Sequence, residues 1–234
     1  MNIFDYFAEL SEKKISYTVK SGRYSAQSKS EGNIPPYLKN IMMLNSKDKF
    51  IEIGSGLGNL LIPLSKYVGK TTALDHPTII KNLKKRVGKK KNFSFISGNF
   101  LKKKINFKYD KILVYGVLHC LKNTKEVNNF IYKGIKILKN GGIIFFGDIP
   151  NESLKQKFLN SRRGKIFQKK WKRSISKQKF ELKNFGSLVK FNNKIIFNIV
   201  KKFENKRTEV YVVPQPNNHP FSNTRVDIII KKYD

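Results

Sequence analysis

Three glycines at alternate positions form the most informative motif of this chain. Gly54, Gly56 and Gly58 follow the apolar run 50–53 and precede a helix-like pattern that starts at residue 60. Glycine tolerates positive φ and lets a ligand approach the backbone closely, and a helix N-terminus behind the turn offers free N–H groups. The motif therefore predicts a nucleotide-like ligand at a strand–turn–helix junction.

Two carboxylates flank the turn. Glu52 lies inside the strand that precedes it, and Asp75 ends a short strand predicted at 71–75. A carboxylate about 20 residues beyond such a turn can accept hydrogen bonds from both hydroxyls of a ribose. A dinucleotide-binding turn would carry its third glycine where this chain has Asn59, so the spacing disfavours a dehydrogenase.

The stretch 52–58, Glu-Ile-Gly-Ser-Gly-Leu-Gly, followed by Asp75, resembles the first motif of the class I S-adenosylmethionine-dependent methyltransferases. The resemblance implies S-adenosylmethionine as cofactor and methyl transfer as the reaction. Asn99 stands where family members often carry an acidic residue for the adenine amino group, and an amide oxygen can also accept from that group. The resemblance implies a cofactor site made of Glu52, Gly54, Ser55, Gly56, Gly58, Asp75, His76, Gly98, Asn99, Phe100, Tyr115 and Gly116.

Few residues in the sequence indicate how the molecule that receives the methyl group is bound or deprotonated. Methyl transfer from a sulfonium requires alignment of donor and acceptor, and a hydroxyl acceptor also requires a base. His119, after the fourth strand, and Asp148, at the end of the fifth, are candidate catalytic bases, although a packing role for His119 stays open. Arg162 and Arg163 could bind a phosphate or carboxylate of the substrate, but adjacent helical residues point about 100° apart.

The turn 147–151 has a faint likeness to small-molecule methyltransferases of bacterial surface-sugar and capsule pathways. This likeness implies a role in surface polysaccharide synthesis. The expected acceptor is a small anionic molecule that is methylated on oxygen or nitrogen. A nucleic-acid methyltransferase that acts on RNA is the open alternative, because the chain is strongly basic. A non-catalytic basic binding protein on a methyltransferase fold is disfavoured by the intact glycines and by Asp75.

Strand and helix patterns alternate from residue 49 to 148, which predicts a parallel sheet with helices on both faces. Strands at 209–213 and 225–230, joined by a proline-rich loop, match an antiparallel hairpin. The expected fold is α/β: a Rossmann-like, seven-stranded, mostly parallel sheet with an antiparallel final strand. We expect 1–48 to form an N-terminal helical lid segment and 49–234 to form the S-adenosylmethionine-binding methyltransferase domain.

After residue 148 the regular alternation of strands and helices ends. The pattern predicts one helix over 152–167, then a basic irregular stretch to residue 179, and a helix over 193–203. The stretch 16–33 is polar and has no clear period.

The net charge of +32 is the other conspicuous property. Eleven Lys or Arg and no acid lie between residues 76 and 109, and another eleven lie between 153 and 180. Such a density of positive charge is typical of a surface that binds nucleic acid or an anionic membrane. It also follows from a composition rich in Lys, Asn and Ile, and the sequence alone leaves both readings open. Nucleic acid is not the favoured partner.

The remaining features of the sequence bear on disulfides, metal sites and the location of the protein. A single cysteine, Cys120, excludes an internal disulfide framework and a cysteine-based zinc site, and no metal is expected. No apolar run is long enough to span a bilayer, and the first residues do not resemble a signal peptide. These features predict a cytoplasmic enzyme without a membrane span; they say nothing of its oligomeric state.

Overall fold

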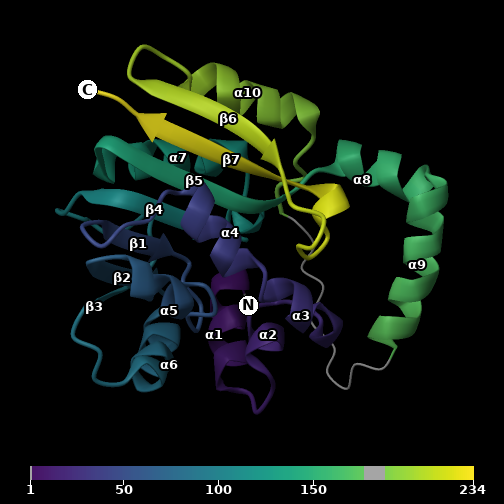
Figure 1. Ribbon diagram of the computed structural model, residues 1–234, viewed down its shortest axis with the longest axis horizontal. Coiled ribbons are helices and arrows are strands. Elements are labelled where there is room, and N and C mark those ends of the chain that lie inside the picture. Colours follow the sequence, from purple (N-terminus) through teal and green to yellow (C-terminus); the bar gives the residue numbers. More distant parts are fainter. Residues whose placement is uncertain (1, 177–187) are drawn as a thin grey trace.

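A single seven-stranded sheet forms the centre of the computed structural model, which describes residues 2–176 and 188–234 (Figure 1). The strand order is β3-β2-β1-β4-β5-β7-β6, in which β1 to β5 are parallel and β7 is antiparallel to both of its neighbours. The predicted α/β fold with an inserted antiparallel strand is confirmed. The strands are β1 (Lys49–Ile53), β2 (Lys70–Asp75), β3 (Phe93–Ser97), β4 (Tyr109–Tyr115), β5 (Leu138–Pro150), β6 (Thr208–Pro214) and β7 (Arg225–Lys232).

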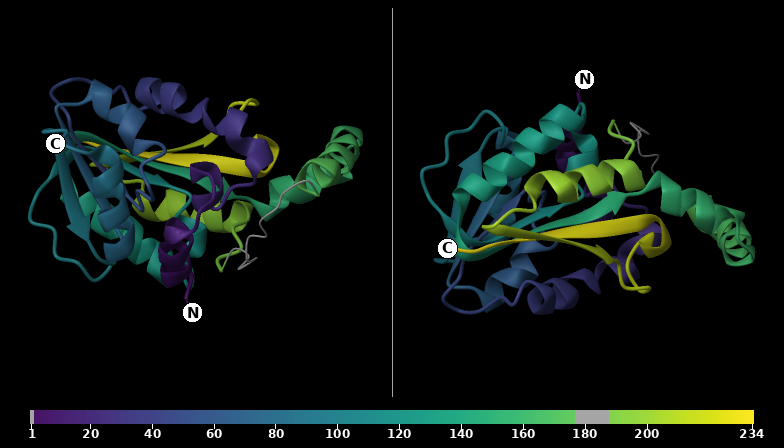
Figure 2. Two further views of the ribbon diagram at one scale, coloured as in Figure 1. Left: turned by 90° about the horizontal axis from the view of Figure 1, so that it is seen from below. Right: turned by 90° about the horizontal axis from the view of Figure 1, so that it is seen from above.

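Helices cover both faces of the sheet, as the views along its edges show (Figure 2). Side chains of α4, α5 and α6 share one core cluster with one face, and those of α7 and α10 share a second cluster with the other. The helices are α1 (Ile3–Glu12), α2 (Tyr17–Lys20), α3 (Ser28–Glu31), α4 (Ile34–Ile41), α5 (Leu61–Leu64), α6 (Pro77–Val87), α7 (Thr124–Ile137), α8 (Glu152–Asn160), α9 (Arg162–Ile175) and α10 (Asn193–Phe203).

The central strands are apolar on both sides because helices bury both faces. Phe145 and Phe146 are adjacent in β5, point to opposite faces, and are both fully buried. The order of the sheet reverses between β1 and β4, and an open α/β sheet binds its ligand at the carboxyl ends beside such a switch. The fold therefore places the glycine turn after β1 at the expected ligand edge.

Two local expectations were wrong. The helix predicted over 152–167 is broken at Ser161, whose hydroxyl accepts from the N–H of Gly164 and so starts the new helix α9. The basic stretch that follows is helical as far as Ile175, rather than irregular; its end, 177–179, lies outside the described residues. As a result α8 and α9 form an arm that projects from the body (Figure 1).

The N-terminal segment contains more helix than its polar sequence indicated, because α2, α3 and the 3₁₀ turn Ser25–Gln27 lie in the stretch without a period. A domain boundary at residue 48 stays a prediction. Of the segment before it, α4 buries Ile34 and Leu38 in the core of the sheet, whereas α1 to α3 lie near the strand ends. None of the helices in the described ranges has the length and apolarity to cross a membrane.

Candidate functional site

The glycine turn between β1 and α5 adopts φ values that L side chains rarely adopt: +78° at Gly54, +51° at Gly56 and +81° at Gly58. A Cβ on Gly54 would lie 2.4 Å from Cγ2 of Val117, so the turn touches the loop after β4. A Cβ on Gly56 would meet nothing within 4 Å, which leaves that backbone open to a ligand. Because α5 has only four residues, backbone N–H groups rather than a long helix dipole are what the turn offers.

Asp75 lies buried beneath the turn at the end of β2. Its Oδ2 accepts from the N–H of Gly56 at 2.7 Å, and its Oδ1 accepts from the N–H of His76 at 2.6 Å. Burial raises the pKa of Asp75 to about 6, although both hydrogen bonds oppose that rise. Each oxygen keeps a second lone pair, so the carboxylate can still accept two hydroxyl hydrogen bonds.

Glu52 lies in β1 and is also buried. Burial, followed by the nearby charge of Asp75, raises the pKa of Glu52 well above its usual range. Its Oε2 and the hydroxyl of Ser55 have no hydrogen-bond partner among the described residues. Buried polar atoms are normally satisfied, so both atoms point to a ligand or water at this place.

The loop after β3 is held to β2 because the N–H of Gly98 donates to the carbonyl of Asp75 at 2.9 Å. Asn99 is exposed, and its Oδ1 accepts from the N–H of Leu101 at 2.9 Å, which leaves one lone pair free. Phe100 differs from expectation, because its ring is buried against Phe130 in the core with centroids 4.6 Å apart. Its ring is thus part of the core, and only its backbone belongs to the loop.

His76 connects the strand ends to the N-terminal segment. Its Nδ1 accepts from the N–H of Thr78 and caps α6, while its Nε2 lies 3.7 Å from Oδ1 of Asp5. The ring of Phe4 packs edge-on against it at 4.8 Å. Helix α1 therefore covers one side of His76, and a lid role for the N-terminal segment stays a prediction.

A buried ion-pair cluster closes the ends of β4 and β5. Asp148 adopts a left-handed conformation with φ of +60°, and its Oδ2 accepts from Nη2 of Arg23 at 2.9 Å. Its Oδ1 lies 3.4 Å from Nε of Arg225. Burial acts to raise the pKa of Asp148, but the charges of Arg23 and Arg225 outweigh it, and the pKa is lowered.

A second chain of hydrogen bonds supports this cluster. Nε2 of Gln215 donates to Oδ1 of Asp227 at 2.7 Å and lies 3.4 Å from the hydroxyl of Tyr115. Oδ1 of Asp227 also accepts from the N–H of Asp148 at 2.9 Å, which supports the unusual backbone there. Gly116, the next residue after Tyr115, is itself left-handed with φ of +71° and lies beside Asp148.

His119 lies in the 3₁₀ turn Leu118–Cys120 that follows β4. Burial, followed by the charge of Arg225, lowers the pKa of its imidazole to about 4, although Asp148 opposes this shift. Its Nδ1 has no hydrogen-bond partner among the described residues. The imidazole is therefore neutral near pH 7.

Comparison with known proteins decides the family. The model of the family described as Nodulation protein S (NodS) matches residues 37–160, more than half of the chain. The chain belongs to the NodS family. No curated protein matches it in sequence. It is an S-adenosylmethionine-dependent methyltransferase, and S-adenosylmethionine is its cofactor, as its first motif indicated.

Solved structures share the fold. The N-methyltransferase NodS from Bradyrhizobium japonicum WM9 in complex with S-adenosyl-L-homocysteine is 14% identical, with a TM-score of 0.67 over 100% of both chains. Magnesium protoporphyrin IX methyltransferase (ChlM) from Synechocystis PCC 6803 is 12% identical, with a TM-score of 0.60 over 98% of this chain and 94% of that one. Phosphoethanolamine N-methyltransferase 1 from Haemonchus contortus is also 12% identical, with a TM-score of 0.68 over 98% of this chain and 48% of that one.

In this NodS-family chain, the two arginines singled out from the sequence are both exposed but have different surroundings. Arg163 lines a cavity of about 210 Å³ between α8, α9 and the loop that joins β6 to β7. Arg162 is not part of that lining. The cavity is walled by Phe158, Phe167 and Phe221, with the imidazole of His219 and the amide and hydroxyl groups of Asn217, Ser222, Asn223 and Thr224.

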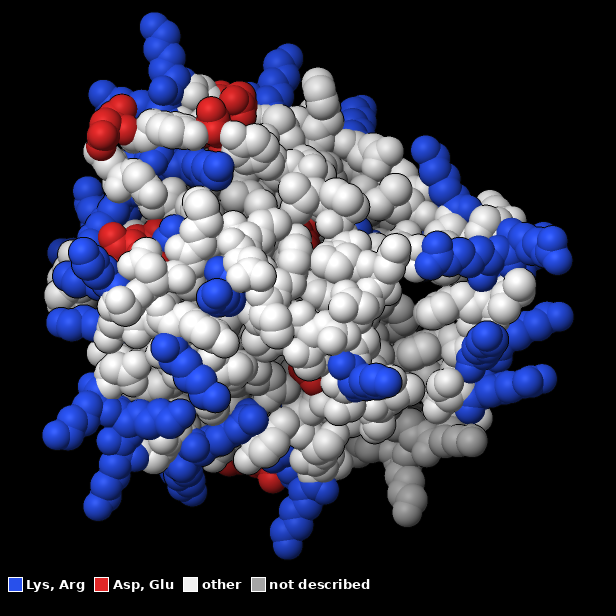
Figure 3. Space-filling model, in the orientation of Figure 1, with Lys and Arg blue, Asp and Glu red and all other residues white. Residues whose placement is uncertain are grey.

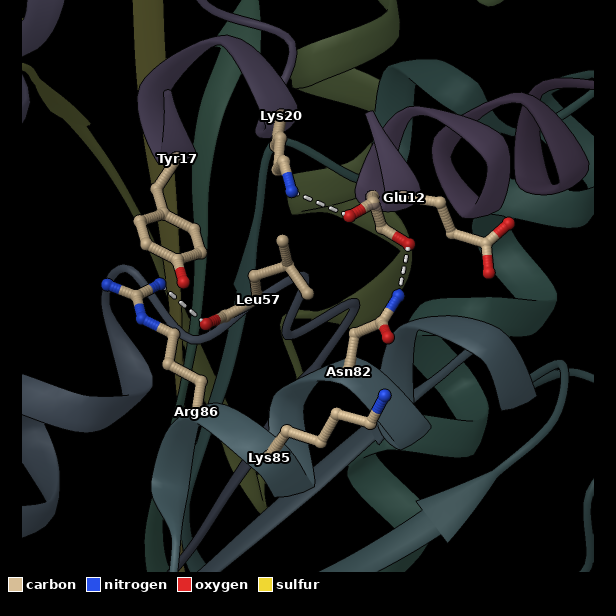
Figure 4. A pocket seen from close by; sticks show the side chains of 8 residues that line it. Glu12, Tyr17, Lys20, Leu57, Asn82, Lys85 and Arg86 are labelled. Atoms are coloured by element: carbon tan, nitrogen blue, oxygen red, sulfur yellow. Dashed lines mark hydrogen bonds between the residues drawn. The ribbon is translucent and has the colours of Figure 1, made fainter. Parts of the chain in front are cut away.

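A larger hollow of about 490 Å³ lies between the N-terminal helices and α6 (Figure 4). Arg86 crosses its edge, where its guanidinium stacks 3.7 Å from the ring centroid of Tyr17 and donates to the carbonyl of Leu57 at 2.7 Å. The lining includes neither Asp75 nor Tyr115. This hollow therefore lies outside the predicted cofactor site, and it meets the glycine turn at Leu57.

Sequence reasoning missed four members of the ion-pair cluster and of the chain that supports it: Arg23, Gln215, Arg225 and Asp227. A charged residue inside an apolar strand was a usable signal for Asp227, which is fully buried in β7. Arg23 carried no local signal, because it lies in the polar stretch without a period.

Proposed function

We propose that the enzyme transfers the methyl group of S-adenosylmethionine to an amine of a small acceptor that also carries an anionic group. A phosphorylated amino sugar of a surface-polysaccharide precursor is an acceptor of this class. The observation that carries the proposal is the cavity of about 210 Å³, where Arg163 stands among aromatic and amide side chains. Its volume is below the 300–1,000 Å³ of typical drug-sized sites, which suits a small acceptor or one unit of a larger one.

The wall of the cavity contacts the ion-pair cluster at the ends of β4 and β5, which is where we propose that methyl transfer occurs. The ring of Phe221 lies 5.6 Å from the guanidinium carbon of Arg225, which in turn contacts Asp148. An acceptor anchored by its anion at Arg163 would thus extend toward the ends of β4 and β5. Arg163 forms no ion pair with any described residue, so its guanidinium is available for a bidentate contact.

For the cofactor, we propose that Asp75 accepts from the ribose hydroxyls and that the open backbone at Gly56 faces the ligand. Glu52 and Ser55, with their unpartnered buried oxygens, would satisfy polar groups of the methionine part directly or through water. The bound cofactor supplies an electrophilic methyl group on a sulfonium, and the protein's task is to align the acceptor with it.

The two catalytic bases predicted from the sequence, His119 and Asp148, are poorly matched to a hydroxyl acceptor, which favours an amine. The pKa of Asp148 is lowered by two arginines, and that of His119 is lowered to about 4, so neither group is matched to proton removal near pH 7. A neutral amine attacks through its own lone pair and needs no base in that step. The Bradyrhizobium japonicum protein is named an N-methyltransferase, which agrees with this choice.

Acceptor profiling by mass spectrometry tests the proposal. The purified enzyme, supplied with S-adenosylmethionine, should methylate an amino-sugar phosphate faster than the uncharged amino sugar, and should not methylate the matching sugar phosphate that lacks the amine. Arg163→Ala should raise KM for the phosphorylated acceptor about tenfold with little change in kcat, as expected for a lost charged hydrogen bond. Arg162→Ala, at its neighbour outside the lining of the cavity, is the matched control.

Equal rates on the hydroxyl-only sugar would overturn the assignment of an amine acceptor. Turnover only with transfer RNA would replace the small acceptor with a nucleic acid. Equal effects of the two arginine substitutions would remove the cavity from the acceptor site.

A further inference from the structure

Helix α9 concentrates positive charge on a part of the molecule that stands apart from the body. Its fourteen residues, RRGKIFQKKWKRSI, include seven Lys or Arg and no acid. None of these seven forms an ion pair with any residue in the described parts of the chain. Figure 3 shows the resulting blue side chains around the arm at the right of the view, without acidic side chains among them.

The helix has two distinct sides. Trp171 faces inward, where its ring meets Tyr24 of the N-terminal segment at 5.1 Å and Phe221 at 4.9 Å. Gly164 faces α8 so closely that a Cβ would lie 1.8 Å from the carbonyl oxygen of Phe158. The opposite side is an exposed stripe at helical spacing, formed by Arg162, Ile166, Lys169 and Arg173.

This arrangement is electrostatically unfavourable in isolation. Lys165 and Lys169, and Lys169 and Arg173, are like charges four residues apart on the same helix, and such pairs destabilise it. Arg162 and Arg163 add positive charge at the N-terminus, where the helix dipole favours negative charge. An anionic partner on the outer side would relieve both effects.

We propose that the outer face of α9 docks on a membrane surface composed of anionic lipids. Ile166, 49% exposed in the middle of the stripe, can enter the headgroup layer while the flanking cations contact lipid phosphates. The aromatic side chains of α9 are engaged inward, so none is free to stack on the bases of a single-stranded nucleic acid. Docking here is independent of the proposed acceptor, and it leaves the cavity at Arg163 on the inner side of the helix.

Vesicle co-sedimentation of the full chain tests docking. The protein should bind vesicles that contain one-third phosphatidylglycerol, should not bind pure phosphatidylcholine, and should be released by high salt as surface charges are screened. The triple variant Arg162→Glu, Lys169→Glu, Arg173→Glu, which reverses the charges of the outer stripe, should partition at least tenfold less. The matched control Lys89→Glu, Lys90→Glu, Lys91→Glu makes the same change of net charge in the exposed loop between α6 and β3.

Thermal stabilisation by S-adenosyl-L-homocysteine checks that both variants remain folded. If the α9 variant fails this check, the variant with glutamine at the same three positions replaces it. Equal loss of binding in the α9 and control variants would assign the effect to total charge and overturn the proposal. Binding to duplex DNA or transfer RNA that depends on α9, without binding to anionic vesicles, would also overturn it in favour of a nucleic-acid partner.

Discussion

Arg23 and Asp148 are 125 residues apart in the sequence, yet Nη2 of the arginine donates to Oδ2 of the carboxylate at 2.9 Å. The pair joins the N-terminal segment to the end of β5, and both side chains are largely buried, with 12% and 9% exposure. The N-terminal segment and the ends of β5 and β7 are therefore one electrostatic unit, because Asp148 is also paired with Arg225 of β7.

Replacement of Arg23 should weaken the whole fold. Arg23→Ala leaves Asp148 with only Arg225, and we expect the free energy of unfolding in urea to fall by about 1–3 kcal/mol, the cost of a lost buried charged hydrogen bond. Arg207→Ala, at an exposed arginine, is the control and should change stability by less than about 0.5 kcal/mol. Equal losses in the two variants would show that the ion pair contributes nothing.

Asn59 should control how firmly α2 and α3 are held against the glycine turn. Its Nδ2 donates to the carbonyl of Tyr17 at 3.0 Å and lies 3.1 Å from Oε1 of Glu31, and its Oδ1 accepts from Arg86 at 2.7 Å. Asn59→Ala should raise hydrogen exchange in α2 and α3 about tenfold, since hydrogen bonds of this kind contribute about 1 kcal/mol each. The exposed Asn40→Ala is the control, and unchanged exchange in both would refute the role.

Removal of the Asp75 carboxylate should weaken cofactor binding. We expect Asp75→Ala to reduce the affinity for S-adenosyl-L-homocysteine by about 1.5–3 kcal/mol, the range for a hydrogen bond to a charged group, measured by calorimetry. Asp110→Ala removes a carboxylate that binds Lys139 and the N–H of Lys49 at the other end of β4, and should leave the affinity unchanged. Retained affinity in Asp75→Ala would place the ribose partner elsewhere.

His119 should not appear in the pH dependence of catalysis near neutrality. Because its pKa is lowered to about 4, it stays neutral from about pH 6 to 8, and its protonation produces no change of kcat in that range. We expect any inflection of kcat/KM in wild type between pH 6 and 8 to persist in His119→Asn. Disappearance of such an inflection in the variant would identify His119 as the titrating base after all.

The sheet was predictable from the sequence because parallel strands are buried on both faces and so form continuous apolar runs, as in 112–114 and 143–146. The glycine turn was predictable for a similar reason, since the backbone conformation at Gly54 and Gly58 is accessible to few other residues. The ion-pair cluster at the ends of β4 and β5 could not be predicted from the sequence. Arg23, Gln215 and Arg225 meet only after folding, and no spacing within a single element signals such a meeting. The break at Ser161 did have a signal, a serine cap, but the helical pattern on both sides concealed it.

Asp227 should make stability depend on pH with a definite sign. Burial, with a smaller contribution from the charge of Asp148, raises its pKa to about 7 from an ordinary value of 3.8. Below about pH 4 the group is protonated in both states and contributes nothing. Between about pH 4 and 7 the folded state holds a proton that the unfolded state has released, so the free energy of unfolding falls as pH rises, by on the order of a few kcal/mol in total.

Asp227→Asn isolates this contribution, because other titrating groups, such as Asp75 and His119, are common to both proteins. Urea unfolding at pH 5 and pH 8 should show wild type losing more stability between the two values than the variant does. A constant difference between the two proteins at both pH values would mean that Asp227 titrates near its ordinary pKa.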